Sequence, residues 1–231
     1  MRRFYSEVKG AQSGDGFLVM LDGKSVRTPL GRTLSLPNAA LAEAIAEEWR
    51  SQGDTIRPES MPLTQLASTA LDRVIPNRAA IIGQLIQYAK TDLLCYRAET
   101  PRDLVARQER EWQPLVDWVT MTFDVELCVT RGIIPVEQPA TSLATLAEVL
   151  ARYDDMRLTA LQSAVAAMGS VLLGLALVEG RLGAEEAFAA SQLDESYQIE
   201  LWGEDAEAAK AREALRNDIA AAAQFIDLYV R

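Results

Sequence analysis

Hydrophobic and polar side chains alternate along the first forty residues, a pattern typical of short β-strands whose two faces meet different surroundings. Asp22-Gly23 is a strong signal for a two-residue hairpin, because both positions tolerate a positive φ. Leu34 and Leu36 fall on one face of the last strand. The predicted elements are strands over 4–8, 17–21, 24–29 and 32–37, with turns at 14–16, 22–23 and 29–31. Together they predict a small antiparallel meander.

The next segment has the period of a helix. Leu41, Ile45 and Trp49 recur every four residues, and Asn38 is a good residue to cap the start of such a helix. A meander of this size is too thin to be stable unless one of its faces is covered. We therefore expect the helix to cover the sheet, which predicts a small α/β domain over residues 1–60.

From residue 61 onward the hydrophobic positions follow helical spacing almost throughout. Pro76-Asn77 and Thr100-Pro101 are predicted to end helices, and Pro114 is predicted to kink one. The predicted helices cover 63–74, 78–96, 102–123, 142–151 and 206–230, while 125–139 reads as extended or irregular. This pattern predicts a larger, all-helical domain over 61–231, and the fold class of the whole chain is α+β.

Residues 158–178 carry no charge over 21 positions, which is long enough to cross a membrane. The stretch contains Thr159, Gln162 and Ser163, and no aromatic residues flank it. These features favour a buried core helix, split near Gly169-Ser170, over insertion into a membrane.

The charge of the chain is strongly negative and unevenly placed. The net charge is −10 with a pI of about 4.7, which argues against a nucleic-acid partner, since phosphate binding needs clustered Lys and Arg. Residues 1–110 hold 15 basic and 13 acidic side chains, while residues 111–231 hold 8 and 20. A basic partner is therefore expected to dock on the second half.

The chain contains no histidine, and this excludes Ser-His-Asp and Cys-His catalysis as well as histidine metal sites. Cys95 has no base to activate it and reads as a small buried hydrophobe. Neither Gly14-x-Gly16 nor Gly180–Gly183 forms a phosphate loop. No catalytic residue, metal site, cofactor or obligatory small-molecule ligand is predicted.

One acidic stretch, 191-SQLDESYQIELWGEDAEAAK-210, concentrates most of the candidate chemistry. Large side chains suited to anchoring a partner lie among its acids, and Gly203 is expected to break the helix next to Trp202. The candidate partner-binding residues are Asp194, Glu195, Glu200, Trp202, Glu204 and Asp205. The residues alone leave three possibilities: a surface for a basic partner, a carboxylate-dependent or metal-assisted enzyme site at 194–205, and a merely solvated acidic face.

Four collinear stretches resemble one known family. They are 17-FLVMLDGKSVRTPLGRTLSLP-37, 47-EEWRSQGDTIRPESMPLTQLASTALDRV-74, 91-TDLLCYRAETPRDLVARQEREWQPLVDW-118 and 193-LDESYQIELWGED-205. This set resembles the assembly chaperones for the α subunit of F-type ATP synthase, and the resemblance spans nearly the whole chain.

The resemblance implies a protein that is not an enzyme and that binds the unassembled α subunit, so preventing its aggregation before the α and β subunits assemble. It also implies a small N-terminal α/β domain followed by a larger helical domain. The family's acidic C-terminal segment matches Asp194, Glu195, Trp202, Gly203, Glu204 and Asp205 here. The family occurs in the mitochondrial matrix of eukaryotes and in related bacteria. Because the chain begins without a signal peptide or presequence, we expect the bacterial cytoplasm.

Overall fold

The computed structural model describes residues 1–14, 16–132 and 134–230, and these residues form two compact units. The N-terminal unit comprises 1–78 with 155–160 and the end of the chain from 224, and the helical unit comprises 79–154 and 161–223. Each unit combines segments that are far apart in sequence. The predicted division into domains at 1–60 and 61–231 is a separate statement about the chain and stays a prediction. The predicted α+β class, with a small antiparallel sheet followed by a mostly helical part, is confirmed.

The sheet of the N-terminal unit is antiparallel throughout. Strand β2 (Gly16–Leu21) pairs with β1 (Val8–Ser13), β3 (Lys24–Ser25) and β4 (Ser35–Leu36). The predicted hairpin at Asp22-Gly23 is confirmed, because both residues have a positive φ, of 46° and 78°. The predicted turn at 14–16 includes Asp15, which lies outside the described residues. Ser13 and Gly16 are paired with each other, at the end of the ladder between β1 and β2.

The strand predicted over residues 4–8 is wrong, since β1 begins only at Val8. The first residues instead pair with the segment after α1, residues 54–55. Arg2 forms a β-bridge with Thr55, and the Arg3 amide donates to the Asp54 carbonyl. The strands predicted over 24–29 and 32–37 are also shorter than expected. Between them the pairing continues only through single hydrogen bonds and the bridge of Arg27 with Thr33.

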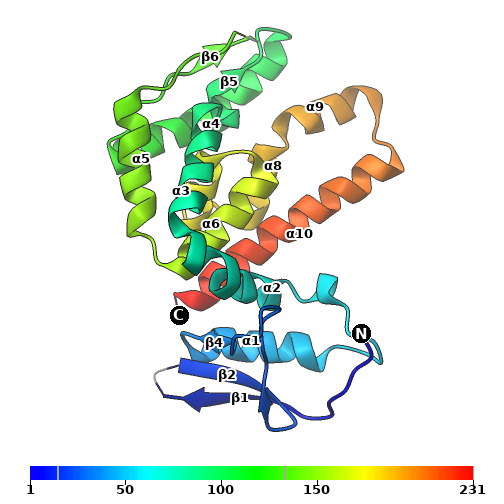
Figure 1. The fold of residues 1–231 in the computed structure, drawn as a ribbon. Helices are drawn as coiled ribbons and strands as arrows, with labels where there is room; N and C mark the ends of the chain where they lie inside the picture. The colour runs from blue at the N-terminus through cyan, green and yellow to red at the C-terminus, as the bar shows by residue number, and fades with distance from the viewer. Residues whose placement is uncertain (15, 133, 231) are drawn as a thin grey trace. The chain divides into compact units, whose positions relative to one another are not determined.

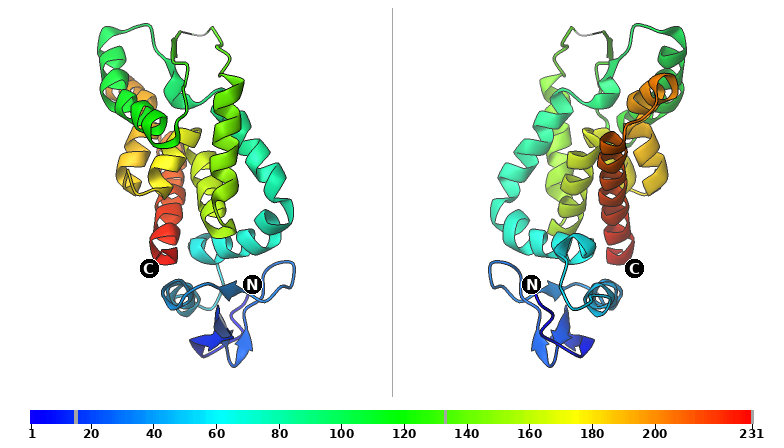
Figure 2. Two further views of the ribbon diagram at one scale, coloured as in Figure 1. Left: turned by 90° about the vertical axis from the view of Figure 1, so that its left-hand side faces the viewer. Right: turned by 90° about the vertical axis from the view of Figure 1, so that its right-hand side faces the viewer.

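Helix α1 (Ala39–Arg50) packs on this sheet (Figures 1 and 2). It begins at the predicted cap, where the Asn38 side chain accepts a hydrogen bond from the Leu41 amide. Leu41 and Ile45 are fully buried, as are Val19 and Leu34 of the sheet segment. The predicted arrangement, a meander covered by a helix, is thus confirmed.

The chain between residues 58 and 97 differs most from the predicted boundaries. A 3-10 turn, η1 (Pro58–Ser60), leads into α2 (Pro62–Thr69), a π-helical turn η2 (Ala70–Val74) and α3 (Ile75–Lys90). The predicted end of a helix at Pro76-Asn77 corresponds to a kink: Asn77 has a φ of −126° and a ψ of 23°, which are not helical, and two helical segments meet there within α3. Helix α3 then ends at Lys90 rather than near 96, because Asp92 caps a 3-10 turn, η3 (Leu93–Cys95).

Two short strands in the helical unit were not predicted. Strand β5 (Tyr96–Arg97) pairs in parallel with β6 (Thr130–Arg131), which lies within the segment expected to be extended or irregular. Ile133, in the same segment, lies outside the described residues. Pairing between two-residue segments so far apart leaves no periodic signal in the sequence, so this connection is visible only in the structure.

The longer helices agree with the predicted segments. Helix α4 (Arg102–Phe123) continues through Pro114, and α5 (Ala140–Arg152) is slightly longer than predicted. The remaining helices are α6 (Asp155–Met168), α7 (Val171–Val178), α8 (Ala184–Ser191), α9 (Leu193–Trp202) and α10 (Ala206–Tyr229).

The uncharged stretch 158–178 is split as predicted, between α6 and α7. Gly169 adopts a positive φ of 68°, and the Ser170 side chain caps α7 by accepting from the Leu173 amide. Every residue of α7 is buried. Gly180 then ends the helix with a positive φ, while the amides of Gly180 and Arg181 donate to carbonyls of the last turn. Within the described part of the chain, no helix has both the length and the apolar character needed to cross a bilayer.

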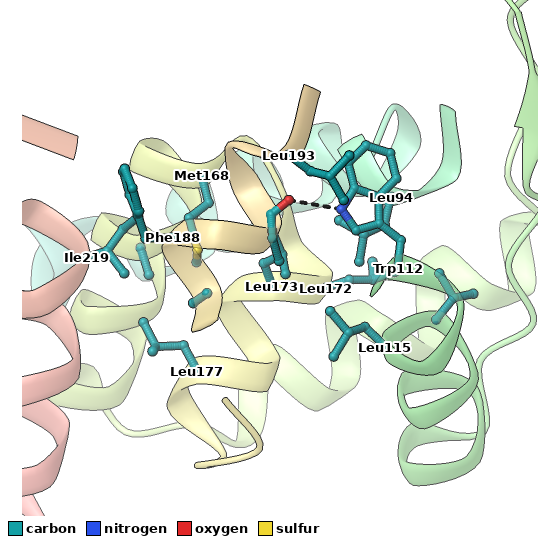
Figure 3. Close-up of a cluster of buried hydrophobic side chains, with 14 of the residues drawn as sticks. Leu94, Trp112, Leu115, Met168, Leu172, Leu173, Leu177, Phe188, Leu193 and Ile219 are labelled. Atoms are coloured by element: carbon teal, nitrogen blue, oxygen red, sulfur yellow. Dashed lines mark hydrogen bonds between the residues drawn. The ribbon is translucent and has the colours of Figure 1, made fainter. Parts of the chain in front are cut away.

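The core of the helical unit is built around α7 and Trp112 of α4 (Figure 3). Trp112 is fully buried, and its indole N–H donates to the carbonyl of Ala190 at 2.9 Å, which satisfies its one polar atom. Leu172, Leu173 and Leu177 of α7 pack in the same cluster. This core joins α4 and α7 to α8 and so supports the helices that follow.

A buried carboxylate holds the start of α7 in this core. Asp92 is fully buried, and its two oxygens accept hydrogen bonds from the Ser170 hydroxyl at 2.7 Å and from the amides of Val171, Leu172 and Leu94 at 2.7, 3.2 and 3.1 Å. A negative group is favourable at a helix N-terminus, where free N–H groups and the helix dipole meet it. Asp92 therefore ties the segment after α3 to the first turn of α7.

We expect the substitution Asp92→Ala to lower the free energy of unfolding by on the order of 3–5 kcal/mol, because several buried donors lose their acceptor together. Denaturation in urea, followed by circular dichroism, measures the change. The exposed Asp218→Ala on α10 is the matched control and should stay within about 0.5 kcal/mol of the wild type. Equal stability of the two variants would contradict the structural role given to Asp92.

The same carboxylate predicts a dependence of stability on pH. Burial raises the pKa of Asp92 to about 6, above its value in an unfolded chain, so the folded protein binds this proton more tightly. The stabilisation from the proton is complete below the unfolded pKa and is lost as the pH rises to about 6. In Asp92→Asn this decrease should be missing. Urea denaturation of both proteins at a series of pH values checks it, and parallel profiles would show that Asp92 does not titrate in this range.

Candidate functional site

Residues 194–205, the acidic corner, comprise most of α9 and the bend that follows it. Helix α9 ends at Gly203, which has a φ of 82° and whose amide donates to the Ile199 carbonyl at 2.8 Å. Helix α10 begins at Ala206. The predicted break next to Trp202 is therefore where the sequence placed it.

One face of α9 is fixed to α4 by buried side chains. Leu193 and Tyr197, one helical turn apart, are both buried. The Tyr197 hydroxyl donates to both carboxylate oxygens of Asp103, at 3.0 and 2.9 Å, and this hydrogen bond lowers the pKa of Asp103. Helix α9 is thus held in one rotation about its axis, which decides which of its acids face solvent.

Asp194 belongs to this anchored face and is half-buried. Its Oδ1 accepts a 2.7 Å hydrogen bond from the side-chain amide of Gln108, which is itself fully buried and accepts from the Ala98 amide. Burial raises the pKa of Asp194, and the hydrogen bond from Gln108 opposes that rise. Its position therefore suits a residue that positions α9 rather than one that meets a partner directly.

Glu200 is exposed and forms an ion pair with Arg107 of α4 at 2.8 Å, which lowers the pKa of Glu200. The Arg107 guanidinium also lies over the ring of Tyr197, 5.3 Å from its centroid. Exposed ion pairs contribute little to stability. The ion pair does hold the Glu200 carboxylate next to Arg107, whose positive charge partly offsets its negative charge.

The two acids after Gly203 have internal roles as well. Asp205 caps α10: its Oδ1 accepts from the amides of Glu207 and Ala208 at 2.8 and 2.9 Å, and these hydrogen bonds lower its pKa. Glu204 lies 3.4 Å from the Arg212 guanidinium. Both residues shape the bend between α9 and α10.

Most of the corner is exposed, including Glu200, Glu204 and Asp205, whose carboxylates have the partners described above. The other exposed side chains of the corner are those of Glu195, Leu201 and Trp202. Trp202 is 74% exposed and Leu201 is 54% exposed, and Glu195 is also on the surface. Glu195 and Trp202 are seven positions apart, so they lie on the same side of α9. A large aromatic side chain that is mostly exposed beside acids is an unusual arrangement for a protein surface, where such groups typically mark binding sites.

Two hollows lie beside the corner, with volumes of about 490 and 310 Å³. Among the described residues, no group of three or more Asp, Glu or Cys side chains is placed to hold a metal ion. Helix α9 contributes Leu193 and Ser196 to the larger hollow, whose charged lining residues come from elsewhere: Arg107, Arg110, Glu111, Arg181 and Glu186. Of the candidate acids, Glu204 lines the smaller hollow, together with Arg212, Glu213 and Arg216. Cys95 is fully buried, and burial raises the pKa of its thiol to about 12, so it is a structural residue as expected.

The residues on α4 that hold the corner are not among the predicted site residues: Asp103, Arg107 and Gln108. Asp103 and Arg107 are four positions apart, which is a signal for a shared helix face. Nothing in the sequence indicates that this face meets α9, some ninety residues later. The pairing depends on how the helices pack around α7.

Comparisons with known proteins agree with one another. The family model of the ATP12 chaperone protein matches residues 2–120, slightly more than half of the chain, although this match ends before the acidic corner. The mitochondrial protein atp12 of Schizosaccharomyces pombe is 28% identical over 236 residues, covering 96% of this chain and 81% of that protein.

Solved structures are similar over almost the whole length. The crystal structure of Atp12 from Paracoccus denitrificans is 40% identical with a TM-score of 0.93, covering 99% of this chain and 98% of that chain. A mutant of P. denitrificans Atp12p, with lysine in place of an aspartate, is 39% identical with a TM-score of 0.93, covering 99% and 97%.

The capping role of Asp205 can be tested by stability alone. We expect Asp205→Ala to lower the free energy of unfolding by about 1 kcal/mol, because α10 loses the acceptor for its first amides. Asp205→Asn keeps a side-chain oxygen and should lose less than half as much. Urea denaturation of the three proteins measures both. A loss of the same size in both variants would assign the effect to charge rather than to capping.

Proposed function

Because the chain belongs to the ATP12 chaperone family, whose members are ATP synthase assembly chaperones and not enzymes, we propose that its client is the α subunit of the F-type ATP synthase. The observation that carries the proposal is the exposure of the apolar side chains of Trp202 and Leu201 at the end of α9, the helix that also carries the exposed Glu195. An unassembled subunit exposes apolar surface that is meant for its permanent partners and tends to aggregate. A chaperone that covers this surface needs an apolar anchor of its own.

Within the corner we assign direct client contact first to Trp202 and Glu195. Trp side chains are enriched among the residues that dominate binding energy, since they bury a large apolar area. Glu195 lies on the same side of α9 and has a free surface position, which suits a charge at the rim of an interface. Asp194, Glu200, Glu204 and Asp205 contribute by positioning α9 and the bend, and by the negative potential they add.

The charge of this part of the chain supports a client with a basic surface. Residues 111–231 hold 20 acidic and 8 basic side chains, so the second half attracts a basic surface over some distance. Such attraction mainly raises the association rate and selects the partner. A chaperone must also release its client to the permanent subunits. A small apolar anchor within a charged rim is compatible with replacement of the chaperone by those subunits.

We place the protein in the bacterial cytoplasm. Its similarity to the Paracoccus denitrificans structure, at 40% identity, exceeds its 28% identity to the mitochondrial protein of Schizosaccharomyces pombe, which supports a bacterial setting. The alternative, a carboxylate-dependent enzyme site at 194–205, is disfavoured because the matching family is one of chaperones.

The proposal is tested by binding of the purified cognate α subunit to immobilised wild-type protein and variants. Trp202→Ala should weaken binding by about 2 kcal/mol or more, roughly 30-fold in Kd, because the apolar anchor is lost. Glu195→Lys should weaken binding most at low salt, since it reverses a charge that attracts the client.

Matched controls come from the same unit. Met121→Ala removes another exposed apolar side chain, and Asp218→Lys makes the same charge change at another exposed position. Both should bind the α subunit like the wild type. If the wild type neither binds the α subunit nor keeps it in solution on co-expression, the proposed client is wrong. If all four variants bind equally well, the corner is not the contact.

A further inference from the structure

The N-terminal unit has a groove of its own, with a volume of about 640 Å³. On one side lies the loop around Pro29 and Leu30, and on the other lie α2 and the π-helical turn η2. Ile56 and Met61, which are buried, line it together with the indole of Trp49. The volume falls within the range of ligand-binding pockets in proteins, and the lining is largely apolar. We call this feature the N-terminal groove.

The rim of the groove presents an apolar side chain that is held outward. Leu30 is 69% exposed. Its amide donates to Asp72 Oδ2 at 2.9 Å, and the Thr28 hydroxyl donates to Asp72 Oδ1 at 2.8 Å. These bonds fasten the loop to η2, so Leu30 is fixed in its exposed position before any ligand binds. Preorganisation of this kind lowers the entropic cost of binding.

The rim is positively charged, in contrast to the chain as a whole. Arg27 and Arg73 both line the groove and are exposed. Arg27 donates to the Gly31 carbonyl, and neither guanidinium forms an ion pair with the described residues. Asp72, the carboxylate of the lining, has both oxygens engaged by the loop. In a protein of net charge −10, two unpaired arginines beside an apolar groove favour an occupant that carries negative charge.

We propose that the N-terminal groove is a second client-binding site, which takes a segment of the client with a large apolar side chain next to a carboxylate. This inference rests on the function proposed above, because it takes the ATP synthase subunit as the client. The apolar lining buries the side chain, and the arginines of the rim form charge-assisted hydrogen bonds with the carboxylate. A basic segment, of the kind that suits the acidic corner, is repelled here. The two sites therefore select different parts of one client.

Overlapping synthetic peptides that cover the cognate α subunit provide the probe. They are titrated against the full-length protein, and binding is followed by fluorescence polarisation of a label on each peptide. The peptides whose binding is weakened by Leu30→Ser, a change in the groove, should contain a large apolar residue beside Asp or Glu. Replacing those acids by Asn or Gln should weaken their binding at least tenfold. If these peptides lack an acid, or if the replacement has no effect, the charge complementarity proposed for the groove is wrong.

Variants of the protein assign the binding to the groove. Leu30→Ser removes the apolar side chain of the rim, and the double substitution Arg27→Glu with Arg73→Glu reverses the charge of the rim. Each should weaken the binding of the acidic peptides at least tenfold. Phe4→Ser, at a residue that is 65% exposed, and Lys24→Glu make the same kinds of change in the same unit outside the groove, and both should bind like the wild type. Thermal unfolding shows that each variant is folded. Equal binding by groove and control variants overturns the assignment.

Binding of the intact α subunit separates the two proposals. If the wild type does not bind the subunit, the proposed function fails. If the wild type binds it and the groove variants bind it equally tightly, only the second site fails. Sedimentation of the protein alone tests the other occupant: if the wild type self-associates, Leu30→Ser abolishes this and the peptides do not bind, the groove takes a second copy of the chain and the client proposal is overturned.

Discussion

The helical unit depends on one buried carboxylate. Asp92 meets the free N–H groups at the start of α7, and α7 in turn is buried along its whole length. A charge so far from water is tolerated only where donors surround it, and here a hydroxyl and three amides do so. Because α7 packs against α4 and α8, fixing its start also fixes the helices that carry the acidic corner.

The proposed partner surface at the acidic corner depends on side chains that point into the protein. Tyr197 and Asp194 face α4 and set the rotation of α9, while Asp205 starts α10. Several of the acids are thereby used in the fold, and what remains open is an aromatic side chain with a few charges. The N-terminal groove has the opposite character, apolar with two arginines at its rim. Two such sites recognise different chemistry, which suits a chaperone that must distinguish one unassembled subunit from other exposed protein surfaces.

Much of the fold was predictable from local patterns. The hairpin at Asp22-Gly23, the cap at Asn38 and the split of the apolar stretch at Gly169-Ser170 each follow from the conformational preferences of a few adjacent residues. The predictions failed where distant segments compete for the same residues. Arg2 forms a β-bridge with Thr55 instead of extending a strand. The helix predicted over 78–96 ends at Lys90, and the Asp92 carboxylate that follows it accepts hydrogen bonds at the start of α7.

For function, the sequence by itself determined the negative charge of the second half, the absence of histidine chemistry and the position of an acidic, aromatic bend, because composition and local order need no knowledge of packing. It could not distinguish the roles of the five acids among the candidate residues, because their side chains are chemically alike. Only the tertiary structure decided that Asp194, Glu200 and Asp205 have partners within the protein while Trp202 and Glu195 remain on the surface, since a side chain's role follows from what lies opposite it. The N-terminal groove also exists only in the fold, where residues 27–30 and 72–73 meet.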